Sequence, residues 1–204
     1  MKKDWTPEQT EKRRLILDAA RELFSKEGVS NVSMRRIAAK VNYSPALIYR
    51  YVKNKEELLD QLRTEGYQIL LNRMARLEVD PDPIKHLTDL AVEYSGFGVD
   101  YWEYYDLMFH MPIQITEDGT VPVKGYEAVL AMVRNAVERA IDAGHFEGCT
   151  VDDAMIMSWS QIHGLLSLYI SGRTPFHMGE DRAKAFLQEI PRHFLRIVAT
   201  GKKN

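Results

Sequence analysis

The chain has 204 residues, of which 45% are hydrophobic and 27% charged. These proportions are typical of soluble globular proteins, and a chain of this length can bury a sizeable core without disulfides or metals. Cys149 is the only cysteine, which excludes an intrachain disulfide framework and a multi-cysteine zinc site and favours a reducing compartment. No segment approaches the roughly 18 apolar residues that a membrane helix needs, so we expect a cytoplasmic protein that does not contact the membrane.

The formal net charge of −2 hides an uneven distribution along the chain. Residues 1–63 carry 14 Lys or Arg against 9 Asp or Glu, whereas residues 64–204 carry 13 against 20. Between Gly28 and Lys55 there are six basic residues and no acidic one. Such a stretch attracts anions whatever its fold, so it is a candidate surface for nucleic acid.

Apolar residues recur at helical spacing almost throughout the chain, and sustained apolar/polar alternation is nearly absent. This pattern predicts an all-α protein of about nine helices. The first helix is expected over residues 8–26, with Gly28 placed to end it. Ser33 is the predicted N-cap of a second helix of about nine residues.

A third short helix is expected over residues 45–51, because Ser44 offers a capping hydroxyl and Pro45 occupies the first helical position. A three-residue turn, residues 41–43, joins it to the second helix. Two short helices in this layout resemble a helix-turn-helix, whose second helix lies in the major groove of DNA.

Asn54 and Glu57 form a predicted capping pair for a long fourth helix that runs to the breakers at residues 79–83. Beyond Pro83 the pattern remains helical, and Pro191 is expected to kink or break the last helix. The five further helices are expected near residues 83–98, 100–110, 123–143, 151–171 and 180–199.

Spacing on the third helix separates the side chains that pack inward from those that can face DNA. The groove-facing candidates are Pro45, Ala46, Tyr49 and Arg50. Arg50 is the expected base reader, because a guanidinium can grip guanine O6 and N7 as a fork. The side chains suited to phosphate oxygens are Ser33, Tyr49, Lys53 and Lys55. An ordinary solvated basic face remains the alternative on these observations alone.

Two segments carry a family resemblance: SMRRIA at residues 33–38 and YSPALIYRYVKNKEEL at residues 43–58. Together they resemble the DNA-binding segment of TetR-family transcriptional regulators, over roughly residues 10–60. Asn42 stands where the family often has glycine, and Val52 where it often has phenylalanine. The first departure suits a left-handed turn residue, and the second only reduces a packing contact.

The resemblance implies an all-α homodimer with a helix-turn-helix DNA-binding domain over residues 1–55. It further implies a helical domain over residues 56–204 that binds a small ligand and supplies the dimer interface. Position by position, it implies that DNA is contacted by Ser33, Arg35, Ser44, Pro45, Ala46, Tyr49 and Lys55.

Aromatic residues are concentrated between Tyr94 and Phe109, where there are seven in sixteen residues. A pocket lined by aromatic and methionine side chains suits an apolar or aromatic small molecule, although a plain hydrophobic core gives the same pattern. The candidate lining residues in this region are Tyr101, Trp102, Tyr105, Met108 and Phe109.

The segment WSQIHGL at residues 159–165 is similar to a Trp/His/Gly pattern in the carboxyl-terminal domain of one TetR-type subgroup. Trp159 and His163 lie one helical turn apart and can share a face, so both are candidate effector contacts. A buried histidine that is hydrogen-bonded by a neighbouring group is the alternative interpretation of His163.

The last two predicted helices have broad apolar faces, and in the resembled family such helices form a dimerising four-helix bundle. A purely intramolecular core is the alternative. The residues of these faces are Leu165, Leu166, Leu168, Tyr169, Phe186, Ile190, Phe194, Ile197 and Val198.

No nucleophile elbow, phosphate loop, dinucleotide fingerprint or zinc-protease motif occurs in the sequence, and the six histidines are scattered. We therefore expect no catalytic residues, metal or cofactor. The sequence predicts a ligand-responsive homodimeric transcriptional regulator, a repressor released from a palindromic operator by a small apolar or aromatic effector. The alternatives are a small-molecule-binding protein without a DNA function and an all-α enzyme that acts through His163 and a tyrosine.

Overall fold

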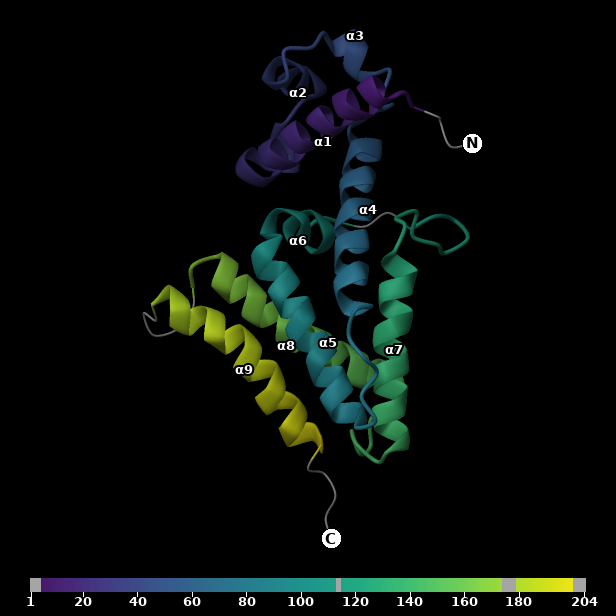
Figure 1. Cartoon of the computed structure of the whole chain (residues 1–204), viewed down its shortest axis with the longest axis vertical. Helices are drawn as coiled ribbons and strands as arrows, with labels where there is room; N and C mark the ends of the chain where they lie inside the picture. The colour runs from purple at the N-terminus through teal and green to yellow at the C-terminus, as the bar shows by residue number, and fades with distance from the viewer. Residues whose placement is uncertain (1–4, 113–114, 174–178, 200–204) are drawn as a thin grey trace. The chain divides into compact units, whose positions relative to one another are not determined.

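The computed structural model describes residues 5–112, 115–173 and 179–199. Over these residues it contains nine α-helices, one short 3₁₀ helix and no strand, which confirms the predicted all-α class (Figure 1). The first helix, α1 (Pro7–Glu27), is opened by a capping box between Thr6 and Gln9. It ends at Gly28, whose φ of 79° is accessible to glycine at little cost. The 3₁₀ helix η1 (Val29–Asn31) follows.

The two short helices of the predicted helix-turn-helix are α2 (Met34–Lys40) and α3 (Pro45–Ile48). As predicted, the hydroxyls of Ser33 and Ser44 cap them, and each accepts a backbone N–H at 3.2 Å. Both helices are shorter than expected. In particular α3 ends at Ile48 because the next residues form tighter i→i+3 hydrogen bonds, such as Tyr51 N to Ile48 O at 2.9 Å.

The long helix α4 (Lys55–Met74) begins where the sequence predicts. Asn54 Oδ1 accepts the backbone N–H of Glu57 at 2.8 Å, which confirms the predicted capping contact. The helix ends at Met74 rather than near Val79, because residues 75–77 turn through hydrogen bonds that include Leu77 N to Met74 O at 3.1 Å.

Five further helices complete the described fold: α5 (Pro83–Asp100), α6 (Trp102–Phe109), α7 (Tyr126–Asp142), α8 (Val151–Ile170) and α9 (Glu180–Ala199). They match the predicted set to within three residues at each end. Of the expected kink or break at Pro191, the break does not occur, because α9 continues through this residue, and the kink stays a prediction. Leu187, Pro191 and Leu195 are all buried, and we attribute the continuity of α9 to this packing, which compensates for the backbone hydrogen bond that proline removes.

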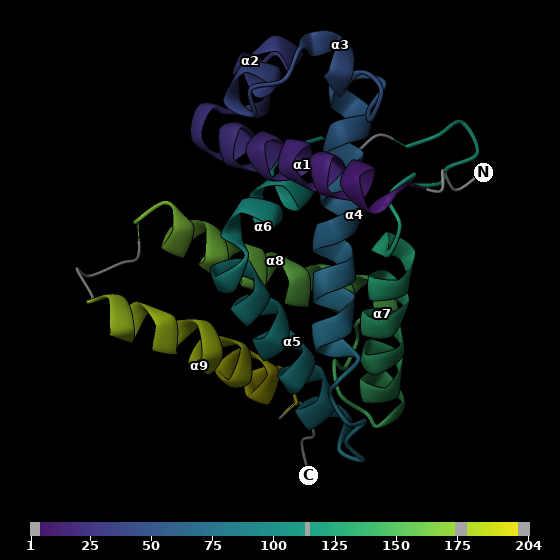
Figure 2. The ribbon, with the colours of Figure 1, turned by 45° about the horizontal axis from the view of Figure 1, so that its top comes forward.

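The chain folds into two compact units. The first unit comprises the chain up to Tyr67 together with Glu103–Lys124, and so holds α1, α2, α3, the first part of α4 and nearly all of α6. The second unit comprises Gln68–Trp102 and the chain from Gly125 onward. In this second unit α5 packs against α7, α8 and α9 (Figure 2).

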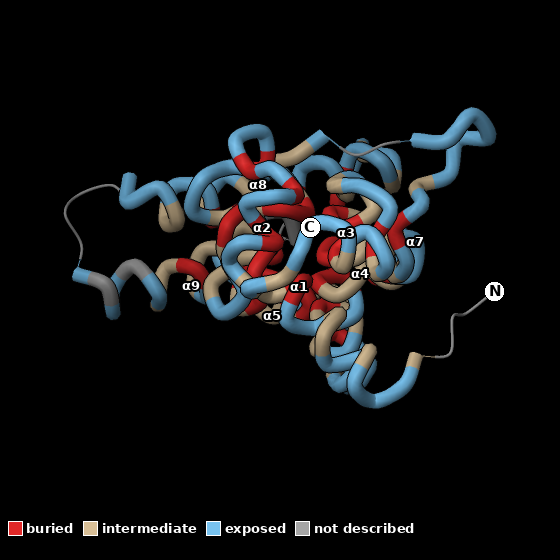
Figure 3. The backbone as a smooth tube through the Cα atoms, turned by 90° about the horizontal axis from the view of Figure 1, so that it is seen from above, coloured by how far each residue is buried: buried red, intermediate tan, exposed pale blue. Residues whose placement is uncertain are grey.

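Each unit has its own apolar interior, and buried positions alternate with exposed ones along the chain (Figure 3). In the first unit the fully buried side chains include Ile16, Phe24, Ile37, Ile48, Leu58, Leu62 and Tyr105. In the second unit they include Leu70, Leu90, Phe97, Val137 and Leu166. Among the described residues, no helix is both long enough and apolar enough to cross a membrane.

Candidate nucleic-acid interface and effector site

The DNA-contact candidates lie on the outer surface of α2, α3 and the segment after α3. We call these elements together with α1 the reading head, residues 7–54. Eight of the nine candidates are exposed, and Tyr49 retains 52% of its accessible surface. The starts of both short helices, capped by Ser33 and Ser44, therefore lie at the surface. The eight exposed candidates are Ser33, Arg35, Ser44, Pro45, Ala46, Tyr49, Arg50 and Lys53.

Ion pairing divides the basic residues of the reading head into two groups. Arg36 pairs with Glu27 at 3.1 Å, and Lys40 pairs at 3.0 Å with Glu22, which Lys26 also contacts, so these two cations already have acidic partners within the protein. Within the described part of the chain, the side chains of Arg35 and Lys53 have no hydrogen-bond or ion-pair partner. Uncompensated cations on an exposed surface are suited to phosphate oxygens.

Lys55 has a structural role that the sequence did not indicate. Its ammonium donates to the backbone carbonyls of Val29 at 2.8 Å and Val32 at 3.2 Å, and so ties the start of α4 to η1. Two of its three N–H groups are used in this way, and phosphate binding by the third stays a prediction. The partners are backbone atoms more than twenty residues away, so no local sequence signal could have revealed them.

The reading head is also held by an aromatic contact just before α1. The rings of Trp5 and Tyr51 stack with their centroids 5.2 Å apart and an interplanar angle of 21°. The sequence did not indicate a role for Trp5, because its partner Tyr51 lies at the far end of the reading head in the chain. At the turn between α2 and α3, Asn42 adopts the left-handed conformation with φ of 56°, which confirms the expectation for this residue.

Three of the effector candidates, Tyr105, Met108 and Phe109, belong to the first unit and pack into its interior. Tyr105 and Met108 are buried, and the Phe109 ring lies 5.2 Å from that of Tyr105 and 5.9 Å from that of Tyr67. Burial raises the pKa of the Tyr105 phenol. These side chains therefore have a packing role in the structure.

In the second unit, Trp159 and His163 meet as predicted, and Tyr94 joins them. The Tyr94 hydroxyl lies 2.8 Å from His163 Nε2, and the indole N–H of Trp159 donates to the same hydroxyl at 3.3 Å. We call these three residues the polar cluster of α5 and α8. Tyr94 was one of the aromatic residues noted in the sequence, but its distance from His163 in the chain hid their contact.

Tyr101 and Trp102, the remaining effector candidates, are 39% and 41% exposed. Tyr101 stacks on Phe97 at 5.7 Å between centroids, and the Arg73 guanidinium lies 6.0 Å from the Tyr101 ring centre. The seven candidates are thus divided between the two units. Among the candidates in the second unit, the rings of Trp159 and His163 are in direct contact, with centroids 5.3 Å apart, and Tyr94 hydrogen-bonds with both.

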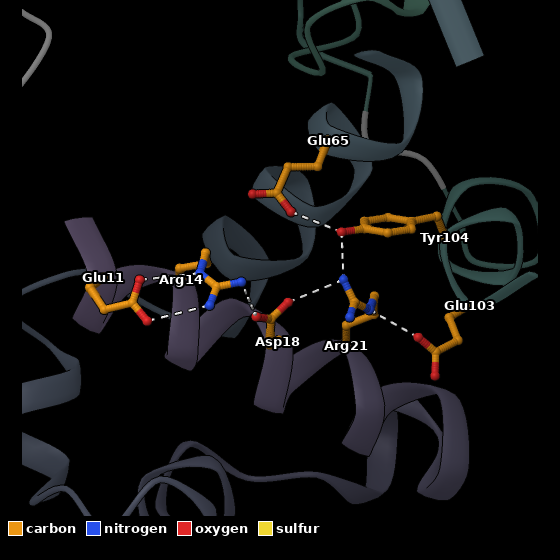
Figure 4. Close-up of polar contacts among 7 residues, drawn as sticks. All are labelled: Glu11, Arg14, Asp18, Arg21, Glu65, Glu103 and Tyr104. Atoms are coloured by element: carbon orange, nitrogen blue, oxygen red, sulfur yellow. Dashed lines mark hydrogen bonds and ion pairs between the residues drawn. The ribbon is translucent and has the colours of Figure 1, made fainter. Parts of the chain in front are cut away.

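A polar network in the first unit joins α1, α4 and α6 (Figure 4). Arg21 donates from Nε to Glu103 at 2.9 Å and from Nη1 to the Tyr104 hydroxyl at 2.6 Å. That hydroxyl in turn donates to Glu65 at 3.1 Å. Burial raises the pKa of the Glu65 carboxyl above its usual range, although the neighbouring Tyr104 and arginines act against this shift. This network was not predicted, since its members are distant in the sequence.

In the described part of the chain, no group of three or more His, Cys, Asp or Glu residues could hold a metal ion. The site is instead a capped pair of helices with exposed cations in one unit and a hydrogen-bonded aromatic cluster in the other. Such a helix pair is typical of DNA-binding regulators.

Comparison with known proteins identifies the family. Residues 16–62 match the family described as "Bacterial regulatory proteins, tetR family", and residues 87–193 match "Tetracyclin repressor-like, C-terminal domain". The second match alone spans more than half of the chain. The chain therefore belongs to the TetR family, and the protein is a DNA-binding transcriptional regulator. The family is one of regulators rather than enzymes.

Relatives of known sequence are also described as regulators. The chain is 26% identical to the uncharacterized HTH-type transcriptional regulator YhgD of Bacillus subtilis, over 78% of this chain and 95% of the relative. It is 27% identical to the uncharacterized regulator YobS of the same organism, over 46% of this chain. That match spans only about half, 49%, of the length of YobS.

Solved structures share the fold. A bacterial regulatory protein of the tetR family from Rhodococcus RHA1 superposes with a TM-score of 0.72 at 21% identity, over 91% of this chain and 96% of that one. The fatty acid degradation regulator FadR from Bacillus halodurans gives a TM-score of 0.71 at 16% identity, over 95% and 96%. At these identities the likeness concerns the fold alone.

Proposed function

We propose that this regulator is a homodimeric repressor in the cytoplasm that binds a palindromic operator and is released by a small apolar or aromatic effector. The observation that carries the proposal is the helix-turn-helix itself. Arg35 on α2 and Lys53 just after α3 are exposed, and their side chains have no hydrogen-bond or ion-pair partner among the described residues, whereas Arg36 and Lys40 are paired with acids. The exposed charge is therefore concentrated where DNA would bind.

The proposed roles of the individual residues in DNA binding follow from their side-chain chemistry. Pro45 and Ala46 are small and exposed, so the start of α3 can approach the base edges closely. Arg50 would read a guanine through its two-pronged guanidinium, and Tyr49 would contact the backbone. Arg35, Lys53 and the remaining N–H of Lys55 would neutralise phosphates and fix the register.

The exposed face of α8 supports a dimer. Met157 and Leu168 are 42% and 41% exposed, and a Cβ built at Gly164 meets nothing within 4 Å. On α9, Ile197 is 72% exposed. Apolar side chains around a glycine allow a second copy to pack closely, with the same surface used twice. The two reading helices would then enter successive major grooves about 34 Å apart.

The polar cluster of α5 and α8 supports an effector site in the second unit. Tyr94, Trp159 and His163 present flat apolar rings whose polar atoms are hydrogen-bonded to one another. An aromatic or apolar effector would find stacking surface there, together with polar groups to fix its orientation. An effector with 1 to 3 kcal/mol of differential affinity for the two states would lower operator affinity about 5- to 150-fold.

The experiment that tests the proposal begins with selection of duplexes from a random library and from genomic fragments. The expected product is a two-fold symmetric sequence, bound by two chains, with affinity that falls steeply as salt rises. A reporter controlled by that sequence should be silenced by the protein, and a library of apolar and aromatic compounds should contain one that restores expression. Recovery of only asymmetric half-sites, or activation of the reporter, would contradict the dimeric repressor.

A further inference from the structure

Arg63 is the bulkiest of the fully buried side chains in the described part of the chain. It lies on α4 in the first unit and is 2% exposed. A guanidinium removed from water is destabilising unless its N–H groups are hydrogen-bonded. Neither the DNA surface nor the polar cluster of α5 and α8 uses this residue, so its buried charge needs a separate explanation.

Three of the four partners of Arg63 lie in the last turn of α6 and in the segment that directly follows it. Its Nε donates to the carbonyl of Leu107 at 2.9 Å, and its Nη2 donates to the carbonyls of Pro112 at 2.8 Å and Met111 at 3.4 Å. Among the described residues, its one acidic partner is Asp60, one turn away on α4, at 3.3 Å. Carbonyls at the end of a helix lack intrahelical partners and carry its negative partial charge. Arg63 therefore caps α6 with a side chain from α4.

One turn further along α4, the two helices are in very close contact. A Cβ added at Gly66 would lie 2.4 Å from Met108 Sδ and 3.2 Å from Tyr104 Cβ. At the amino end of α6, the Arg21 network holds Glu103 and Tyr104. The helix is thus fastened to the rest of the first unit at both ends and along its length.

These contacts hold α6 in one position relative to α4. A slide of α6 by one residue, about 1.5 Å, would separate the guanidinium from carbonyls that it contacts at 2.8 and 2.9 Å. It would leave a buried cation with one carboxylate partner and several unpaired carbonyls, which is strongly unfavourable. Small displacements of α6 relative to α4 are therefore resisted, and α6 moves together with α4 and α1.

We propose that Arg63 is a positioning residue for operator binding: by capping α6 from α4, it makes α6 and the reading head one rigid body presented to DNA in one orientation. The inference rests on the proposed operator function, but its first readout does not need DNA. Arg63 contacts no nucleic acid in this scheme and acts through α6.

The test is Arg63→Lys, which keeps the positive charge but offers three N–H groups on one nitrogen, too few for the four acceptors that Arg63 contacts. We expect hydrogen exchange at the backbone amides of residues 103–109 to accelerate at least tenfold in the free protein. Affinity for the duplex selected by the parent protein should fall at least tenfold, with an unchanged slope of affinity against salt, since no phosphate contact is removed.

The matched control is Arg134→Lys, which alters an exposed arginine paired with Asp152 and should leave both readouts within twofold of the parent. If Arg63→Lys does not fold, Gly66→Ala decides the question, because it separates the same two helices without altering a charge. A variant that melts at a lower temperature but, while folded, keeps parental affinity and α6 exchange would overturn the inference. If the parent selects no duplex, the proposed function fails, and the exchange measurement still tests the role of Arg63.

Discussion

At the scale of single residues, the contribution of a basic side chain to DNA binding depends on whether the protein already neutralises it. Arg35 and Arg36 are neighbours on α2 and both are exposed. Only Arg36 has a carboxylate partner, Glu27 at 3.1 Å. A cation paired with a carboxylate releases fewer counterions from DNA than an unpaired one, so the two arginines should differ in their effect on binding.

The first prediction uses this pair. Arg35→Ala should weaken binding to every duplex and reduce the slope of log affinity against log salt by about 1, the value for one phosphate contact. Arg36→Ala, its matched control, should leave the slope unchanged and lower stability by less than about 1 kcal/mol, because an exposed ion pair contributes little. Fluorescence anisotropy titrations over a salt series measure both slopes. A parental slope for Arg35→Ala would show that this residue meets no phosphate.

The second prediction concerns the partly buried carboxyl of Glu65. Burial raises its pKa in the folded protein above the value in the unfolded chain, so protonation favours folding. The associated stability is fully present below the unfolded pKa and is lost as pH rises through the folded pKa. At neutral pH the charged carboxylate therefore destabilises the fold.

Glu65→Gln removes the charge but keeps an oxygen that can accept the Tyr104 hydroxyl. It should be more stable than the parent near neutral pH, and the difference should shrink as pH falls toward about 4. Thermal unfolding at a series of pH values gives the comparison, with Glu138→Gln on an exposed face of α7 as the control. A glutamine variant that is less stable than the parent at neutral pH would show that the charge of Glu65 stabilises the fold, which contradicts the prediction.

At the scale of elements, the turn between α2 and α3 sets the angle at which α3 is presented. Asn42 holds that turn with a positive φ of 56°. Asn42→Ala should cost about 1 kcal/mol, since an ordinary side chain is strained there, whereas Asn42→Gly should change stability by at most a few tenths of that. Urea unfolding measures the difference. Equal losses in the two variants would mean that the asparagine side chain, and not the backbone angle, stabilises the turn.

Elements whose signals are local were predictable from the sequence, and contacts between distant elements were not. The caps at Ser33, Ser44 and Asn54 act within three residues, so the helix starts could be placed correctly. The end of α3 was placed too late, because apolar spacing is the same in a helix and in the tight turns that follow it. The capping of α6 by Arg63 joins residues more than forty positions apart, and nothing in either segment indicates it.

The candidate sites also divide into features with a local sequence signal and features that depend on distant contacts. Helical register predicted that Pro45, Ala46, Tyr49 and Arg50 face outward, and all four are exposed, whereas their contacts with DNA stay predictions. The sequence could not show which aromatic residues are exposed, which pack in a core and which line a ligand site, because core packing and ligand binding use the same residue types. Tyr105 and Met108 are buried in one unit, while Trp159 and His163 belong to the other.

At the scale of the whole molecule, we expect the α8 face to hold two copies together. Gly164→Leu would place a branched side chain where the proposed partner packs most closely, and should give single chains with unchanged helix content. Light scattering after gel filtration measures the mass, and circular dichroism measures the helix. Glu138→Leu, which adds the same side chain to an exposed position of α7, should remain dimeric. A Gly164→Leu protein with the parental dimer mass would rule out this face.

The stacking of Trp5 on Tyr51 has a practical consequence. Trp5 belongs to the first unit, whereas Trp159 donates its indole N–H to Tyr94 in the second. Indole emission responds to polarity and to neighbouring rings, so once Trp102 is replaced the chain carries one intrinsic fluorophore in each unit. Versions that retain one tryptophan at a time should report the arrival of DNA and the entry of a small molecule as separate signals, each on its own timescale and without an attached dye.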